Sequence, residues 1–223
     1  LHFVPEERLG RGAVPEMSLA DNLLLTRREA VGTLGWLRTG RLRDQAADII
    51  ERFRVKAAGP GAPARSLSGG NLQKFIMGRE IDAKPTLLIV SQPTWGVDVG
   101  AAAQIRAEIL ALRDAGCAVL VVSEELDELF ELSDRLHVMA KGRLSPSVAR
   151  RDAAVEQIGE WMSGLWHADL QKHLQQIEAS HDGNAVHLRH AASTEHRGTE
   201  AQRKEEVFLW RTLCLCASVF CSE

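Results

Sequence analysis

The chain has 223 residues, of which 45% are hydrophobic and 26% are charged, and its formal net charge is −3. This length and balance fit one globular domain with an additional tail. The nearly neutral charge argues against a dedicated nucleic-acid surface, and no apolar run reaches the ~18 residues that a membrane-spanning helix needs.

Apolar periodicity and turn residues divide the chain into alternating strands and helices. In chain order we predict a strand at 1–5, a helix at 18–28, a loop at 32–40, a helix at 42–53, a linker at 58–65, a helix at 71–81, a strand at 85–90, a helix at 101–115, a strand at 119–122, a helix at 126–132, a strand at 136–140 and a helix at 148–165. Ser18, followed by Asp21, has the pattern of a capping box. The alternation favours an α/β fold around a parallel sheet.

The run Leu67-Ser-Gly-Gly-Asn-Leu-Gln-Lys74 places a good N-cap residue, Ser68, and two glycines, Gly69 and Gly70, at the start of a predicted helix. The first N–H groups of a helix have no intrahelical partner, and the helix dipole favours an anion there. The run resembles the signature loop of ABC-type ATPases, Leu-Ser-Gly-Gly-x-x-Gln. This resemblance implies that Ser68, the two glycines and Gln73 close over ATP held by the opposite ATP-binding domain. The alternative is an ordinary capped helix.

The predicted strand at 85–90 leads into Ser91-Gln-Pro-Thr-Trp-Gly-Val-Asp98. This segment resembles the Walker B strand and the D-loop of the same family, with Asp98 as the D-loop aspartate. The order of signature helix, strand, Pro-Thr and Gly-x-Asp is more specific than either motif alone. The fold implied is the P-loop NTPase-like ABC ATPase domain, with a parallel sheet core and a helical signature subdomain.

The nucleotide site departs from the family pattern at several positions. Ser91 and Gln92 stand where the family has Asp-Glu at the end of Walker B. Mg²⁺ prefers carboxylate ligands, and an amide can orient water but cannot take its proton. Glu124 stands at the position of the switch histidine, where a carboxylate would repel phosphate, and Glu6 replaces the Q-loop glutamine. These departures agree with each other and predict a degenerate site, in which we assign no catalytic residue.

Several stretches narrow the resemblance to the second ATP-binding half of sugar- and nucleoside-type ABC importers. They are Phe3-Val-Pro-Glu-Glu-Arg-Leu-Gly-Arg-Gly12, Met17-Ser-Leu-Ala-Asp-Asn22, Gln92-Pro-Thr-Trp-Gly-Val-Asp-Val-Gly100 and Ser123-Glu-Glu-Leu-Asp-Glu-Leu129. The resemblance covers roughly 3–166, and we expect a partial ATP-binding domain at 1–166 with its helical subdomain at about 16–82. The chain carries no Walker A sequence, so we expect a fragment that begins inside the domain.

The resemblance also implies cofactors and partners. ATP and Mg²⁺ would belong to the full assembly, with a second ATP-binding half or subunit and transmembrane permease subunits as partners, and without nucleic acid. A permease helix would dock near 8–22, although Arg8, Arg11 and Glu16 also read as ordinary solvated surface. The location implied is the cytoplasmic face of the cell membrane. The solute that the resemblance implies is a simple sugar or a nucleoside.

The remaining residues, 167–223, have no steady period and are predicted to be a disordered tail. Cys214, Cys216 and Cys221 match no zinc-ligand spacing, so we expect no metal site. Cys117 precedes a buried strand and is expected to be a core thiol.

Two functions stay open. The first is the ATP-binding subunit of an importer, which contributes its signature loop to a composite ATP site. The second is a non-enzymatic remnant or partner-binding module without ATPase activity, which the missing Walker A favours. A soluble ABC ATPase of repair or translation is a third option that the Pro-Glu-Glu-Arg pattern at 5–8 disfavours.

Overall fold

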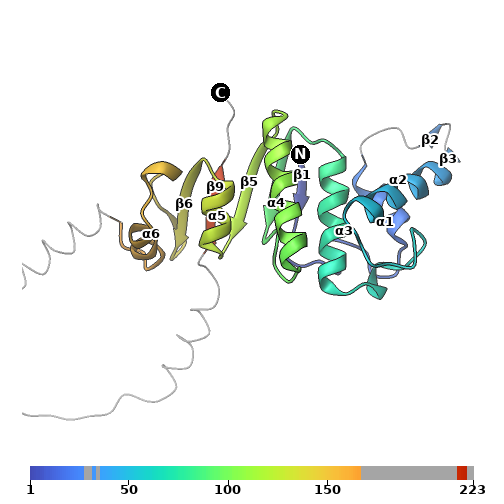
Figure 1. Ribbon diagram of the computed structural model, residues 1–223, viewed down its shortest axis with the longest axis horizontal. Helices are drawn as coiled ribbons and strands as arrows, with labels where there is room; N and C mark the ends of the chain where they lie inside the picture. Colours follow the sequence, from blue (N-terminus) through green and yellow to red (C-terminus); the bar gives the residue numbers. More distant parts are fainter. Residues whose placement is uncertain (28–31, 34–35, 167–214, 220–223) are drawn as a thin grey trace, which may run out of the picture. The chain divides into compact units, whose positions relative to one another are not determined.

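The computed structural model describes residues 1–27, 32–33, 36–166 and 215–219 (Figure 1). It separates into two compact units. Of the described residues, the first unit contains 1–27, 32–33, 36–136, 149–151 and 216–219, and the second contains 137–148, 152–166 and 215.

The core of the first unit is a parallel sheet. Its strands β1 (His2–Val4), β4 (Leu87–Ser91) and β5 (Ala118–Ser123) pair in parallel, with β4 between the other two. Val4, Val90 and Val121 lie opposite one another in register, and all three side chains are fully buried. Because branched apolar side chains pack well in a parallel sheet that is covered by helices, the sequence predicted this core correctly.

One further strand joins the first unit. β9 (Leu215–Val219) pairs antiparallel with β5, with Ser123 opposite Cys216. It falls inside the segment that we predicted as a disordered tail, so five residues of that segment form a strand instead. The rest of the tail, with Cys214 and Cys221, lies outside the described residues.

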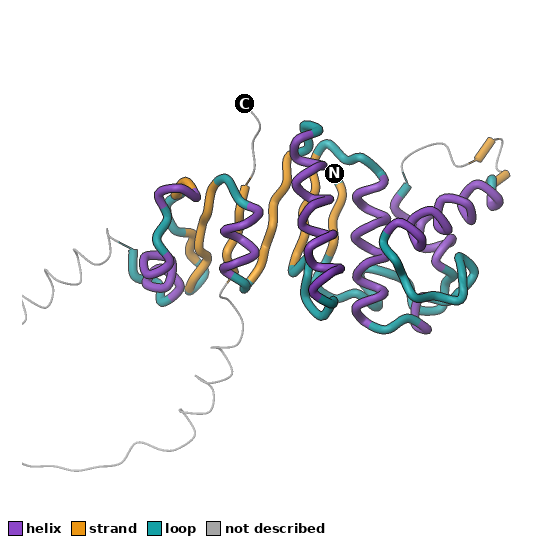
Figure 2. Tube along the Cα trace, viewed as in Figure 1, coloured by secondary structure: helices purple, strands orange, loops and turns teal. Residues whose placement is uncertain are grey.

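Three helices follow β1 in the chain and pack together (Figure 2): α1 (Leu19–Thr26), α2 (Thr39–Arg52) and α3 (Gly69–Asp82). α2 lies against both of the others. The Ser18 side chain accepts from the Asp21 N–H at the start of α1, as the capping pattern predicted, and its hydroxyl donates to the Asp21 carboxylate. These are the helices that we assign to the helical subdomain, whose boundary at 16–82 stays a prediction.

Helices α4 (Val99–Asp114) and α5 (Leu126–Leu132) complete the first unit, and both pack against β5. α5 has the bounds that the sequence predicted. α4 begins two residues earlier than predicted because the Asp98 side chain caps it, accepting from the Ala101 N–H at 2.9 Å. Cys117, just before β5, is 4% exposed, and the prediction of a core thiol is confirmed.

Two segments of the first unit are more regular than predicted. The expected loop at 32–40 contains a small antiparallel pair, β2 (Gly32–Thr33) and β3 (Trp36–Leu37). Within the predicted linker at 58–65 a short 3-10 helix, η1 (Ala64–Ser66), begins just before the signature loop. Such short elements depend on their surroundings, so single-sequence periodicity does not detect them.

The second unit contains a hairpin and a helix that is shorter than predicted. The hairpin joins β6 (Arg135–Ala140), most of which lies in this unit, to β7 (Arg143–Leu144). The predicted helix at 148–165 is helical only over α6 (Val155–Met162), because the residues before it form β8 (Val148–Ala149) and the 3-10 helix η2 (Arg150–Asp152). The apolar period that motivated the longer helix exists only from residue 155 onward, and the backbone of Ala154 is extended.

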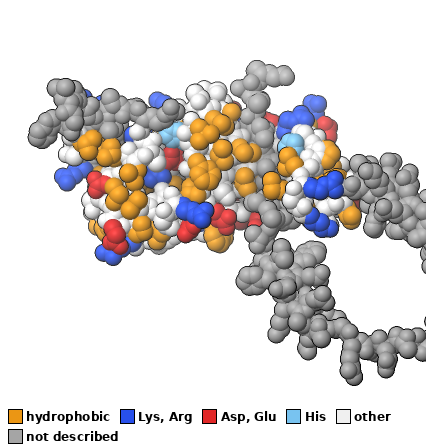
Figure 3. All heavy atoms as spheres, turned by 180° about the vertical axis from the view of Figure 1, so that it is seen from behind, with side chains coloured by type: hydrophobic (Ala, Val, Ile, Leu, Met, Phe, Trp, Pro, Cys, Tyr) orange, Lys and Arg blue, Asp and Glu red, His pale blue; other side chains and the backbone are white. Residues whose placement is uncertain are grey.

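The surface agrees with the nearly neutral composition. Acidic and basic side chains are interspersed with hydrophobic ones on the face drawn in Figure 3. Among the described residues, no helix has the length and apolar character to cross a membrane.

Candidate functional site

The signature loop leads directly into α3. Ser68 has extended backbone angles, φ −65° and ψ 154°, and occupies the N-cap position that the sequence predicted. Its hydroxyl accepts from Asn71 Nδ2 at 2.9 Å instead of capping a backbone N–H. Ser68 and Gly69 are exposed. The first N–H groups of this 14-residue helix therefore face outward beside small residues, which is the arrangement that binds anions.

The signature glutamine points into the protein. Gln73 is 1% exposed, and its Nε2 donates to the carbonyl oxygens of Gln92 at 3.2 Å and Pro93 at 3.0 Å. An amide nitrogen has two protons, and both are used here. Gln73 therefore connects α3 by hydrogen bonds to the loop after β4. We call this segment the 91–98 loop.

A second, closer contact joins the same two segments. A Cβ at Gly70 would lie 2.6 Å from the carbonyl oxygen of Gly96, which no real Cβ tolerates. Gly96 itself has φ +66°, a conformation that favours glycine. Only a residue without a side chain at position 70 allows the backbones to approach this closely.

The 91–98 loop ends at Asp98. This carboxylate is exposed, and its hydrogen bond from the Ala101 N–H lowers its pKa below the ordinary value, with a further contribution from the nearby Lys74. Asp98 therefore stays ionised at the N-terminus of α4, where the helix dipole favours a negative charge. Its position beside α3 follows from the contacts of Gln73 and Gly70 with the same loop.

The residues that we predicted to stand at the family's hydrolytic positions meet at one edge of the sheet. Glu6 follows β1, Ser91 ends β4 and is succeeded by Gln92, and Glu124 follows β5. Because the three strands are parallel neighbours, their carboxyl ends lie side by side, and such edges are the usual ligand sites of parallel sheets. Gln92 has φ +50° and is 9% exposed, and its Oε1 accepts from the Ser123 hydroxyl at 3.4 Å.

The side chains at the end of β4, Ser91 and Gln92, are a hydroxyl and an amide, whereas Mg²⁺ prefers carboxylate ligands. In the described part of the chain, no group of three or more His, Cys, Asp or Glu side chains is placed to hold a metal. The outward-facing N–H groups of α3, in contrast, suit a phosphate.

Glu128 is a buried carboxyl that sequence reasoning missed. It lies on α5, is 3% exposed, and accepts from the Thr94 hydroxyl at 2.7 Å. Burial raises its pKa above the ordinary value, and hydrogen bonds from Thr94 and Ser123 oppose the rise in part. No motif marks this residue, since only the fold brings α5 against the 91–98 loop.

Replacing Glu128 with glutamine should make stability less dependent on pH. A carboxyl whose folded pKa is raised stabilises the fold fully below its unfolded pKa, and this contribution is lost as pH rises through the folded pKa. The amide of the substituted side chain can still accept from Thr94 and carries no charge. Unfolding temperatures measured from about pH 4 to about pH 8 should therefore shift in favour of the variant as pH rises. Glu124→Gln, which removes a charge from an exposed site, is the control, and an equal pH trend in both variants would contradict the prediction.

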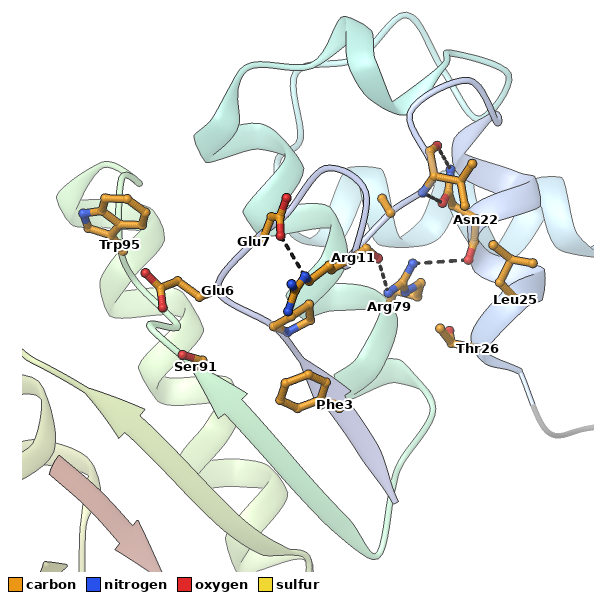
Figure 4. A pocket seen from close by; sticks show the side chains of 14 residues that line it. Phe3, Glu6, Glu7, Arg11, Asn22, Leu25, Thr26, Arg79, Ser91 and Trp95 are labelled. Atoms are coloured by element: carbon orange, nitrogen blue, oxygen red, sulfur yellow. Dashed lines mark hydrogen bonds and ion pairs between the residues drawn. The ribbon is translucent and has the colours of Figure 1, made fainter. Parts of the chain in front are cut away.

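A cavity of about 680 Å³ adjoins this edge of the sheet (Figure 4). Glu6 and Ser91 lie on its β4 side, and Leu25 and Thr26 lie on its α1 side. Phe3 and Leu25, 51% and 56% exposed, give the cavity apolar walls. It is also lined by the segment 5–7 and by 11–14, so it overlaps the region where the sequence predicted a permease contact.

Solved structures resemble this fold. A dimeric bacterial ABC transporter cassette, MJ0796, matches with a TM-score of 0.54 and 18% identity, over 67% of this chain and 62% of that one. An ATP-binding subunit of an ABC transporter matches with a TM-score of 0.53 and 18% identity, over 78% of this chain and 67% of that one. The chain has the ABC ATP-binding cassette fold. The predicted fold class, an α/β cassette with a parallel sheet core, is confirmed.

Curated relatives of the cassette are import proteins. The nucleoside import ATP-binding protein NupA of Lactococcus lactis subsp. cremoris (strain MG1363) is 42% identical over 163 residues, 72% of this chain and 32% of NupA. The guanosine import ATP-binding protein NupO of Bacillus subtilis (strain 168) is 39% identical over 171 residues, 76% of this chain and 34% of NupO. The glucose import ATP-binding protein TsgD13 of Haloferax volcanii is 42% identical over 166 residues, 73% of this chain and 30% of TsgD13. The chain spans about a third of the length of these relatives. No protein-family model matches it.

Proposed function

We propose that the cassette is part of the ATP-binding subunit of an importer for a nucleoside or a simple sugar. In this proposal it supplies its signature loop to ATP held by another cassette. The observation that carries it is the exposed start of α3, where Ser68 and Gly69 leave backbone N–H groups facing outward. The similarity to NupA, NupO and TsgD13, whose names state import of nucleosides or glucose, supports the solute class.

The cassette's own nucleotide site is proposed to be degenerate. Ser91 and Gln92 supply neither a carboxylate ligand for Mg²⁺ nor a base for water. Glu124 adds a negative charge near the same edge, where phosphate would be repelled. ATP and Mg²⁺ would then be held by the other cassette, and this chain would contribute to hydrolysis from across the interface.

The proposed partners follow from the same geometry. A second ATP-binding half would face α3 and the 91–98 loop, and transmembrane permease subunits would use the cavity between β1 and α1. The assembly would then lie on the cytoplasmic face of the cell membrane. The alternative function is a non-enzymatic remnant or a partner-binding module without ATPase activity. It would keep the same fold, so only the activity of the assembled transporter distinguishes the two functions.

Replacing Ser68 with arginine in the full-length protein tests this function. The long cation would cover the helix N-terminus and displace the phosphate contact. We expect solute-stimulated ATPase activity of the assembled transporter to fall by about 100-fold, the scale for losing one oriented donor to a reacting group.

Ser66→Arg provides the matched control. Ser66 is an exposed serine two residues earlier in η1, and its hydroxyl donates to the Pro63 carbonyl. Activity should stay within about twofold, as for most surface substitutions. Full activity in Ser68→Arg would favour the remnant.

A further inference from the structure

Arg8 connects three segments of the first unit. Its Nε donates to Gln73 Oε1 at 3.0 Å, and its Nη2 donates to the backbone carbonyl of Trp95. The guanidinium carbon also lies 5.3 Å from the centre of the Trp95 ring, within cation–π distance. Arg8 follows β1, Gln73 belongs to α3 and Trp95 belongs to the 91–98 loop, so one side chain holds all three.

The guanidinium fits closely between two glycines. A Cβ at Gly69, the first residue of α3, would lie 3.0 Å from Nη1, and a Cβ at Gly96 would lie 3.3 Å from the same atom. Arg8 is half-buried, and burial lowers its pKa, although an arginine stays charged at neutral pH. The planar guanidinium group therefore fills the space between the signature loop and the turn at Gly96.

Arg11, three residues after Arg8, makes the contacts expected of a surface arginine. It forms an ion pair with Glu7 at 2.8 Å, and both side chains are more than half exposed. Such surface pairs contribute little to stability or geometry. The contacts of Arg11 are therefore those of an ordinary solvated surface residue, whereas Arg8 is half-buried and contacts two further segments of the site.

We propose that Arg8 is a positioning residue that transmits movement of the segment 6–12 to the signature loop and the 91–98 loop together. Glu6, Glu7, Arg11 and Gly12 of this segment line the cavity where we place the permease contact. A partner that pushes on the segment displaces Arg8, and Arg8 pulls on Gln73 and Trp95. This role rests on the proposed function, because it couples the permease surface to the composite ATP site.

Two substitutions separate the charge of Arg8 from its geometry. Arg8→Gln removes both, and Arg8→Lys keeps the charge but loses the planar fork that reaches two acceptors and stacks on a ring. In the assembled full-length transporter, we expect both variants to lower the ratio of solute-stimulated to basal ATPase activity by about tenfold. Arg43→Gln changes an exposed arginine of α2 that does not line the cavity, and as the matched control it should stay within about twofold of the parent. The ratio does not depend on the folded fraction, since both rates scale with it.

A second readout needs no nucleotide. The contribution of Trp95 to the fluorescence of the full-length protein is obtained by difference from Trp95→Phe. Without the guanidinium over the ring, the Trp95 emission should shift to longer wavelength and become more accessible to acrylamide in both Arg8 variants. It should stay unchanged in Arg43→Gln.

The outcomes separate this role from the proposed function. In one outcome, Ser68→Arg inactivates the assembly while Arg8→Lys and Arg8→Gln keep the ATPase ratio of the parent. This result would overturn the positioning role and leave the proposed function standing. Full activity in Ser68→Arg would remove the proposed function and the coupling role with it. An unchanged Trp95 signal in Arg8→Gln would overturn the contact itself.

Discussion

Replacing Gly70 with alanine should lower the coupled ATPase activity of the assembled transporter by about 100-fold. The new Cβ would lie 2.6 Å from the carbonyl oxygen of Gly96, a backbone atom that cannot turn away as a side chain can. The 91–98 loop is also held by Gln73, so relieving the clash displaces the loop or α3. A displacement of about 1 Å at a reacting site can cost about 100-fold in rate. Overpacking should also lower stability by about 1–3 kcal/mol.

Gly61→Ala is the matched control for this substitution. A Cβ at Gly61 would meet no atom within 4 Å, so the same chemical change has no steric consequence there. Activity and unfolding temperature should both stay close to those of the parent. A Gly70→Ala variant that behaves like Gly61→Ala would show that the two backbones do not approach as the structure indicates.

Replacing Arg79 with methionine should destabilise the fold by about 3–5 kcal/mol, the usual cost of leaving a buried charge without its partner. Arg79 and Glu80 are 3% and 1% exposed and are joined at 2.5 Å. The other Glu80 oxygen lies 2.5 Å from His2 Nδ1 on β1. Arg79 also donates to the backbone carbonyls of Gly12 and Asn22, at 2.8 and 3.2 Å, and methionine would leave both without this donor.

Arg11→Met makes the same change at an exposed ion pair and should cost less than about 1 kcal/mol. Equilibrium urea unfolding of both variants gives the comparison. The double variant Arg79→Met with Glu80→Leu should lose less than the sum of the single changes, because it removes both charges of the pair. An Arg79→Met variant as stable as Arg11→Met would contradict the buried network.

The parts of the site that sequence predicted are local in the chain. Ser68, Gly69 and Gly70 stand next to one another, and their effect on a helix N-terminus depends only on neighbouring residues. Asp98 was assigned from the resemblance of the contiguous segment 91–98 to the D-loop, and that role stays a prediction. The alternation of apolar runs likewise predicted the parallel strands, because burial on both faces leaves a local signature.

The parts that sequence missed depend on distant contacts. Arg8 meets Gln73 and Trp95 across 65 and 87 residues, and no spacing rule links such positions. Gln73, which we predict to close over ATP, also donates its amide to the carbonyl oxygens of the 91–98 loop, and no local pattern indicates this second contact. Short elements were missed for a related reason, since β9 is stabilised by pairing with β5, a strand far earlier in the chain.

The most direct test of the composite site is to locate trapped nucleotide in the full-length transporter. A photoreactive ATP analogue is trapped with vanadate during turnover, and proteolysis then identifies the labelled cassette. If this chain only completes a site held elsewhere, the label will lie on the partner cassette and will disappear in Ser68→Arg. Label on this chain's own cassette, retained in Ser68→Arg, would contradict both the degenerate site and the contribution of the signature loop in trans.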